Sequence, residues 1–177
     1  MRRQRRRHSP EVDVIYNSGL PNYVDLAIGN RESLLQDYDG FWRGYRLNIV
    51  WTTEVVPPEV VRSVVEVGRG QIHHFDVKKT RDWQRDGNEE WNQRVESFLS
   101  FVHESIEAGC HVRICDNSGR HRSGTAMALY LMVRTRQYFR EIKRFIRRQR
   151  PSVNIRPDER FLTAAAQEFA EWRGQPW

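Results

Sequence analysis

Residues 112–132 read VRICDNSGRHRSGTAMALYLM, and this stretch decides the fold. An apolar strand ends near Cys115, a turn containing glycine follows, and an apolar helical segment begins at Arg122. A strand that enters a helix through such a turn directs successive backbone N–H groups at one point, and the helix adds the positive end of its dipole there. The stretch therefore predicts an oxyanion-binding loop at the carboxyl end of a strand, where open sheets usually bind ligands.

Each position of this loop suits an anion. Glycine allows the tight path of the chain, and the guanidinium of Arg122 can bind two phosphate oxygens at once. Ser123 adds a hydroxyl. The predicted anion-binding residues are Asn117, Ser118, Gly119, Arg120, His121 and Arg122. The plainer alternative is an ordinary strand-to-helix turn with a surface arginine.

Asp116 places a negative charge at the floor of a loop that is suited to bind one. Beside Arg122 and a helix N-terminus, its carboxyl group should be ionised at neutral pH. It would then repel a phosphate, since two unit charges 4 Å apart interact by roughly 4 kcal/mol at an effective dielectric constant of about 20. Alternatively, the carboxylate accepts hydrogen bonds from the loop N–H groups and from Arg122, so that the loop is filled by its own side chain.

Strands and helices alternate along the rest of the chain. Short apolar or β-branched runs predict strands at 11–16, 23–29, 46–53, 71–77 and 111–115. Helices are expected at 30–45, 57–68, 89–108, 122–135, 138–148 and 157–172, and residues 78–88 read as a polar loop. The apolar stripe of the 89–108 segment is core rather than a ligand box. This alternation predicts an α/β domain with helices on both faces of its sheet.

The 177 residues suffice for one domain, expected at 11–177 behind a basic flexible tail at 1–10. The composition, 38% hydrophobic and 11% aromatic, is that of a globular protein. No apolar run reaches the 18 or so residues of a membrane span, and no apolar segment of a signal peptide follows the Arg-rich start. We expect an intracellular protein, cytoplasmic or nuclear.

The net charge of +6 is concentrated in two segments. Residues 1–10 hold five arginines and no acid, and residues 134–150 hold eight Lys or Arg against one Glu. Such segments contact nucleic acid, phospholipid or acidic proteins. The alternatives are a disordered arm or targeting signal for the first and a solvated helix face for the second. RNA is therefore one expected partner, through the tail and residues 134–150.

The two cysteines do not form an internal disulfide, because five residues of extended chain separate Cys110 from Cys115 by roughly 16 Å. Reduced thiols are expected. No evident set of metal ligands occurs in the loop, so neither a metal nor a cofactor is predicted.

The loop resembles the signature loop of the cysteine-dependent dual-specificity protein phosphatases, a His-Cys pair, five residues and then Arg-Ser. The matching residues are Gly119, Arg122, Ser123 and Gly124. The nucleophile position falls on Asp116, and Cys115 stands where the family carries histidine. YVDLAIGNRES and RRQRPSVNIRPDERFL resemble the family's opening and closing segments, so the resemblance covers roughly residues 13–172. It implies a central, mostly parallel sheet flanked by helices.

The resemblance also implies a general acid about thirty residues before the nucleophile. Asp82 and Asp86 lie in the matching segment, with Asp86 nearest the expected spacing and Asp76 earlier in the strand. The alternative for Asp86 is a solvated acid. Cys115 could replace the missing nucleophile only with a loop one residue longer, and its side chain lies on the other side of the strand from its neighbour.

Three functions follow from these residues. A catalytically impaired phosphatase-like protein would bind a protein or phosphorylated partner. A basic α/β domain would bind RNA or a phosphorylated metabolite, because the GRHRS run (119–123) also resembles a loop in the C-terminal domain of bacterial RNase-adapter proteins. An active phosphatase whose nucleophilic cysteine was replaced by Asp116 is the third.

Overall fold

The computed structural model of the chain describes residues 12–17, 25–35, 46–66, 70–86, 89–155 and 159–171, with the backbone alone at 12–17, 25, 65, 66 and 83–86. In this part of the chain, five strands form one sheet in the order β1-β2-β5-β3-β4. The strands are β1 (Val12–Asn17), β2 (Asp25–Asn30), β3 (Leu47–Trp51), β4 (Ile72–His74) and β5 (His111–Asp116).

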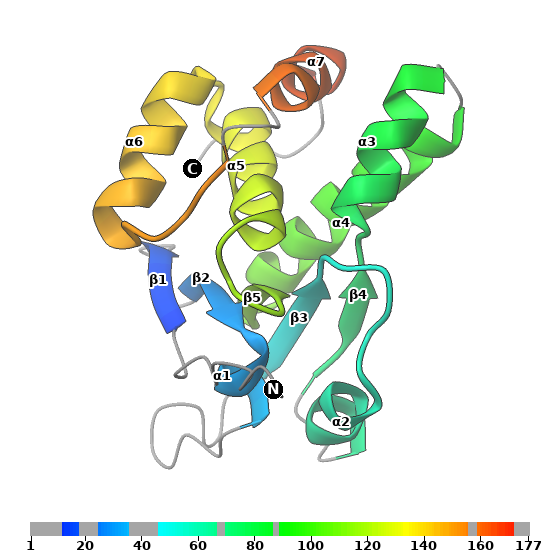
Figure 1. Cartoon of the computed structure of the whole chain (residues 1–177), viewed down its shortest axis with the longest axis vertical. Coiled ribbons are helices and arrows are strands. Elements are labelled where there is room, and N and C mark those ends of the chain that lie inside the picture. Colours follow the sequence, from blue (N-terminus) through cyan, green and yellow to red (C-terminus); the bar gives the residue numbers. More distant parts are fainter. Residues whose placement is uncertain are drawn as a thin grey trace, which may run out of the picture.

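The strands β2, β5, β3 and β4 run parallel, and β1 pairs with β2 in the antiparallel direction. The central strand is β5, with Asp116 beside Asn30 of β2 and Cys115 beside Trp51 of β3. The carboxyl ends of the parallel strands therefore meet at one edge, above which the loop after β5 lies (Figure 1). The prediction of an α/β fold with a mostly parallel sheet flanked by helices is confirmed.

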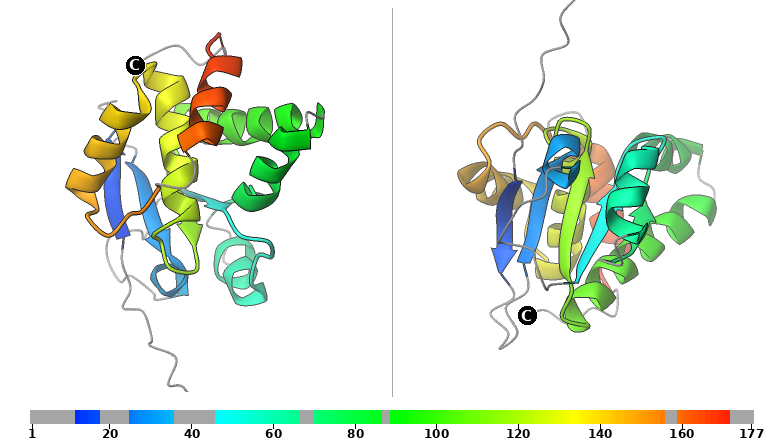
Figure 2. Two further views of the ribbon diagram at one scale, coloured as in Figure 1. Left: turned by 45° about the horizontal axis from the view of Figure 1, so that its top comes forward. Right: turned by 90° about the horizontal axis from the view of Figure 1, so that it is seen from below.

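Two hydrophobic clusters cover the sheet. The larger joins Leu26, Ile28, Val112 and Ile114 to the helices α4, α5, α6 and α7, and the smaller joins Ile49, Trp51 and Cys115 to α2 and η1. The right-hand view of Figure 2 looks onto the sheet, with α5, α6 and α7 behind its strands. The helical segments are α1 (Arg31–Leu35), α2 (Pro58–Val61), the π-helical η1 (Arg62–Glu66), α3 (Val77–Asp86), α4 (Glu89–Glu107), α5 (Arg122–Thr135), α6 (Phe139–Gln149) and α7 (Glu159–Glu168).

The helices expected at 89–108 and 122–135 are both present in the structure. α5 has the predicted bounds, α4 ends one residue early, and the α4 stripe from Trp91 to Ile106 is buried as core. Of the helix expected at 30–45, α1 covers 31–35, and residues 36–45 lie outside the described part. No helix in the described ranges is long and apolar enough to cross a membrane.

The expectation of a polar loop at 78–88 is wrong for its first nine residues, which belong to α3. The helix forms because Asp76 caps it: one carboxylate oxygen accepts the N–H groups of Lys78 at 3.0 Å and Lys79 at 3.1 Å. Thr80 also donates its hydroxyl to the Asp76 carbonyl at 2.7 Å. A polar composition hid this helix, since Val77 and Trp83 are its only apolar residues.

Candidate anion-binding loop

The loop joins the central strand to the most buried helix of the molecule. It leaves β5 at Asp116 and enters α5 at Arg122, and all residues of α5 from Ser123 to Arg134 are buried. Its two ends are therefore fixed by the core, and the backbone between them is held in one path.

The Asp116 carboxylate occupies the centre of this loop. One oxygen accepts the N–H of Ser118 at 2.7 Å, the Ser118 hydroxyl at 3.1 Å and the N–H of Gly119. The other accepts the N–H of Ser123 at 3.0 Å and its hydroxyl at 3.1 Å. Three backbone N–H groups of the loop and of the first turn of α5 thus point at an internal carboxylate.

These hydrogen bonds set the ionisation of the group. Burial opposes the charged form of Asp116, but the backbone N–H groups of Ser123, Ser118 and Gly119 favour it, and the pKa of the carboxyl lies below its ordinary value. Asp116 is therefore ionised at neutral pH, as expected, and its charge is held by short-range donors.

The expected contact of Arg122 with Asp116 is not formed. Both residues lie in the described part of the chain, and no hydrogen bond or ion pair joins them there. The side chain of Arg122 is half-buried at the start of α5. Among the described residues, the Arg122 guanidinium therefore has no acidic partner.

Gly119 is the residue on which the path of the loop depends. Its φ of +66° lies in the left-handed region, which favours glycine. A side chain there would also meet the Arg150 guanidinium at 2.8 Å and the Gly29 carbonyl oxygen at 3.0 Å. Arg150 is buried and donates from Nε to the Gly119 carbonyl at 2.9 Å.

The segment after α6 closes over the same loop. The N–H of Asn154 donates to the Arg120 carbonyl at 2.8 Å, and the Asn154 carbonyl lies 3.2 Å from Nδ1 of His121. Val153 packs tightly on Gly124: a Cβ atom added to Gly124 would lie 2.6 Å from Cγ1 of Val153. The sequence predicted Arg150 only as part of a basic segment and did not predict its contact with the loop. The resemblance of RRQRPSVNIRP to the closing segment of the phosphatase family was the signal that could have indicated this contact.

Cys115 belongs to the hydrophobic core and not to the loop. Its side chain is fully buried on the opposite side of the strand from Asp116, among Leu47, Ile49 and Trp51. Burial raises the pKa of this thiol to about 12, so it stays protonated at neutral pH. Both Cys110 and Cys115 are buried free thiols.

The acids proposed as proton donors lie on or before α3. Asp76 is buried and caps that helix, Asp82 is half-buried within it, and Asp86 is its last residue, with a side chain outside the described part. Figures 1 and 2 show α3 running away from the loop toward the start of α4. The roles of Asp82 and Asp86 stay predictions.

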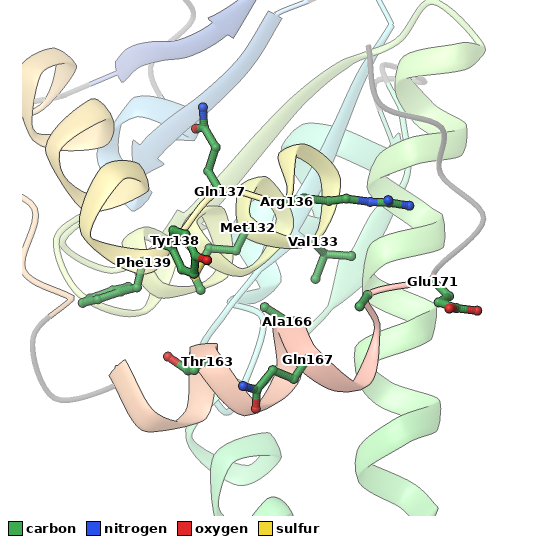
Figure 3. Close-up of a pocket in the computed structure, with 11 residues that line it drawn as sticks. Met132, Val133, Arg136, Gln137, Tyr138, Phe139, Thr163, Ala166, Gln167 and Glu171 are labelled. Atoms are coloured by element: carbon green, nitrogen blue, oxygen red, sulfur yellow. The ribbon is translucent and has the colours of Figure 1, made fainter.

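A separate pocket of about 640 Å³ lies at the other end of α5, between α5, α6 and α7 (Figure 3). Met132, Phe139 and Ala166 contribute apolar surface, and Arg136 and Glu171 lie at its border. Because α5 has 14 residues, about 20 Å of helix separates this pocket from the loop. Among the described residues, no group of three or more His, Cys, Asp or Glu side chains could hold a metal ion.

Comparisons with known proteins match at the level of structure alone. No protein-family model matches the sequence, and no curated protein matches it. The crystal structure of DUSP15 superposes with a TM-score of 0.60 at 20% identity, over 86% of this chain and 90% of that one. PTPMT1 superposes with a TM-score of 0.58 at 16% identity, over 91% of this chain and 97% of that one. Human DUSP28 superposes with a TM-score of 0.52 at 16% identity, over 92% of this chain and 95% of that one. The shared feature is the fold.

Proposed function

We propose that this chain, which has the fold of the dual-specificity and protein-tyrosine phosphatases, is a catalytically impaired phosphatase-like protein that acts by binding a partner. In this proposal, Asp116 fills the loop in place of an external oxyanion. The observation that carries it is the set of hydrogen bonds from Ser118, Gly119 and Ser123 to the Asp116 carboxylate.

Three physical reasons support the loss of phosphatase activity. The N–H groups that would stabilise a bound phosphate already serve a carboxylate, so a ligand must compete with an internal group that loses no entropy of association. The ionised carboxylate also repels a phosphate, by roughly 4 kcal/mol for each unit of phosphate charge at 4 Å and an effective dielectric constant of about 20. Cys115 supplies no thiolate, because its pKa is about 12.

Arg122 supports a residual capacity for anions. Its guanidinium is half-buried at the N-terminus of α5 and forms no ion pair with Asp116 within the described residues. A phosphorylated ligand that approaches the rim could therefore contact Arg122 without displacing the carboxylate. Weak binding of an oxyanion is the expected behaviour of the unmodified protein.

The test is tungstate binding, measured by calorimetry and by thermal shift at pH 7. Asp116→Asn removes the charge at nearly constant shape, and we expect it to bind tungstate roughly tenfold to a thousandfold more tightly than the unmodified protein. Asp116→Asn combined with Arg122→Ala is the control and should lose that gain. Equal affinity in the unmodified protein and Asp116→Asn would contradict the filled loop.

Activity separates this proposal from that of an active phosphatase. The unmodified protein is expected to leave para-nitrophenyl phosphate intact. If it turns the compound over, and Asp116→Asn abolishes the turnover, Asp116 is a nucleophile and the proposal is wrong. Turnover by Asp116→Cys alone would support a loop that keeps the geometry of the fold while lacking its nucleophile.

A further inference from the structure

Helix α6 presents a dense group of cations to solvent. Arg140, Arg144, Arg147 and Arg148 are exposed, and Lys143 is half-buried. These five residues are named the α6 basic face. Glu141 is the acid of the helix, and it accepts the N–H of Tyr138 at 3.3 Å as part of the helix cap.

The cations of the α6 basic face have no acidic partner in the described part of the chain. Within the described residues, none of them forms an ion pair or a hydrogen bond with an acidic side chain; Lys143 lies 5.5 Å above the ring of Phe139. At about 100° per residue, the five positions span roughly 140° on one side of the helix. Phe139, Ile142 and Ile146 face the core on another side.

The structure divides the basic segment predicted at 134–150 into two groups. Arg134 and Arg150 are buried, and Arg150 holds the loop through the Gly119 carbonyl. They cannot contact a partner without unfolding. The residues available to a ligand are those of the α6 basic face and the exposed Arg136 just before the helix.

Hydrogen bonds join the segment that directly follows the α6 basic face to the anion-binding loop. Arg150 follows α6 directly and donates to Gly119, and Asn154 donates to the Arg120 carbonyl. Arg120 and Arg122 of the loop are half-buried and form no ion pair among the described residues. α6 also packs beside β1, whose first residue, Val12, pairs with Gly29 at the edge of the sheet that carries the loop.

We propose that the α6 basic face binds single-stranded nucleic acid through its phosphates. Four of its five cations are arginines, whose planar guanidinium groups match phosphate oxygens in pairs. Tyr138, at the start of the helix, is 81% exposed and offers a ring on which a base can stack. This inference names the partner class of the binding role proposed above, but it uses residues outside the filled loop.

A lipid surface fits the helix less well. Membrane-surface helices insert an apolar face among the lipids. In α6, Phe139, Ile142 and Ile146 are buried, and Phe145 packs against the core. The helix has no free apolar face to insert while the protein stays folded. An acidic protein would satisfy the arginines but gives no role to the exposed ring of Tyr138.

The experiment uses the full chain and a fluorescein-labelled 15-nucleotide poly(U) RNA, with anisotropy recorded at several salt concentrations. The test variant replaces Arg140, Arg144, Arg147 and Arg148 with glutamine. The matched control replaces four exposed cations elsewhere, Arg46, Arg62, Lys79 and Arg160, and so removes the same charge. Circular dichroism and thermal unfolding verify the fold of both variants.

We expect the test variant to bind at least roughly tenfold more weakly than the control at 0.15 M salt. Its slope of log affinity against log salt should be shallower by up to about 2.8, or 0.7 for each lost phosphate contact. Tyr138→Ala should also weaken RNA binding. It should leave the slope of log affinity against log salt unchanged, because stacking releases no counterions.

Several results would overturn the proposal. One is an equal loss of RNA affinity in the test and control variants, because it would assign RNA binding to the net charge of the protein. Another is binding that is lost only when the five arginines of residues 1–10 are replaced. A third is binding to phosphatidylserine vesicles, or to poly-glutamate, that is as tight as binding to RNA. Tungstate binding by Asp116→Asn is measured separately, so failure of RNA binding leaves the filled loop standing, and the reverse also holds.

Discussion

At the scale of single residues, Asp116 explains why a loop suited to anions carries an acid. The carboxylate accepts three backbone N–H groups and two hydroxyl groups, so the loop is satisfied without a ligand. A buried carboxylate with so many donors stabilises the surrounding structure, whereas each buried donor left without a partner costs about 1–3 kcal/mol. The hydrogen bonds of Asp116 therefore also help to hold the loop.

The lowered pKa of Asp116 predicts how the free energy of unfolding changes at low pH. Because the folded-state pKa is below that of the unfolded chain, the stabilising contribution is complete above about pH 4 and is lost as the pH falls through the folded value. We expect the difference in free energy of unfolding between the unmodified protein and Asp116→Asn to shrink between pH 6 and pH 3 in urea titrations. Glu168→Gln, an exposed change on α7, should show no such narrowing.

Gly109 and Gly119, which both have left-handed backbone conformations, offer a matched pair of substitutions. Gly109 has a φ of +72° and open space where a Cβ would lie, whereas a Cβ at Gly119 would meet Arg150 and the Gly29 backbone. Gly109→Ala should cost about 1–2 kcal/mol from the backbone conformation alone. Gly119→Ala should cost clearly more in urea unfolding; equal costs would mean that the loop shifts freely away from Gly29.

At the scale of elements, a helix cap formed α3 and burial shaped α5, neither of which the pattern of polar and apolar residues specified. α3 was expected to be a loop, because residues 78–88 are polar, and yet it is a helix that begins at an aspartate. α5 is so completely buried that its apolar character is not confined to one face. Its bounds were still predictable from the turn before Arg122.

The cap of α3 can be tested directly. Asp76→Ala removes the acceptor for the N–H groups of Lys78 and Lys79 and should destabilise the protein by about 0.5–2 kcal/mol in urea unfolding. Lys79→Ala, an exposed change in the same turn, should stay within about 0.5 kcal/mol. A smaller effect for Asp76→Ala than for Lys79→Ala would show that α3 does not depend on this cap.

At the scale of the whole molecule, the order of the sheet creates the site. The chain places β5 between β2 and β3, so the loop after β5 lies at the centre of the carboxyl edge. The segment after α6 returns across this edge, where Arg150 and Asn154 contact the loop. A contact between residues 119 and 150 is invisible to a local reading of the sequence.

The sequence by itself determined the alternation of strands and helices, the glycine-bearing loop between a strand and a helix, and the acid at the start of that loop, because these depend on residue type and short spacing. The tertiary structure alone decided that Asp116 bonds to Ser118, Gly119 and Ser123 rather than to Arg122. It alone also divided the basic segment into buried and exposed arginines. The partners of Asp116 depend on the exact path of the loop backbone, which residue types alone do not specify. The burial of the arginines depends on packing against residues far apart in the chain, which local patterns do not specify.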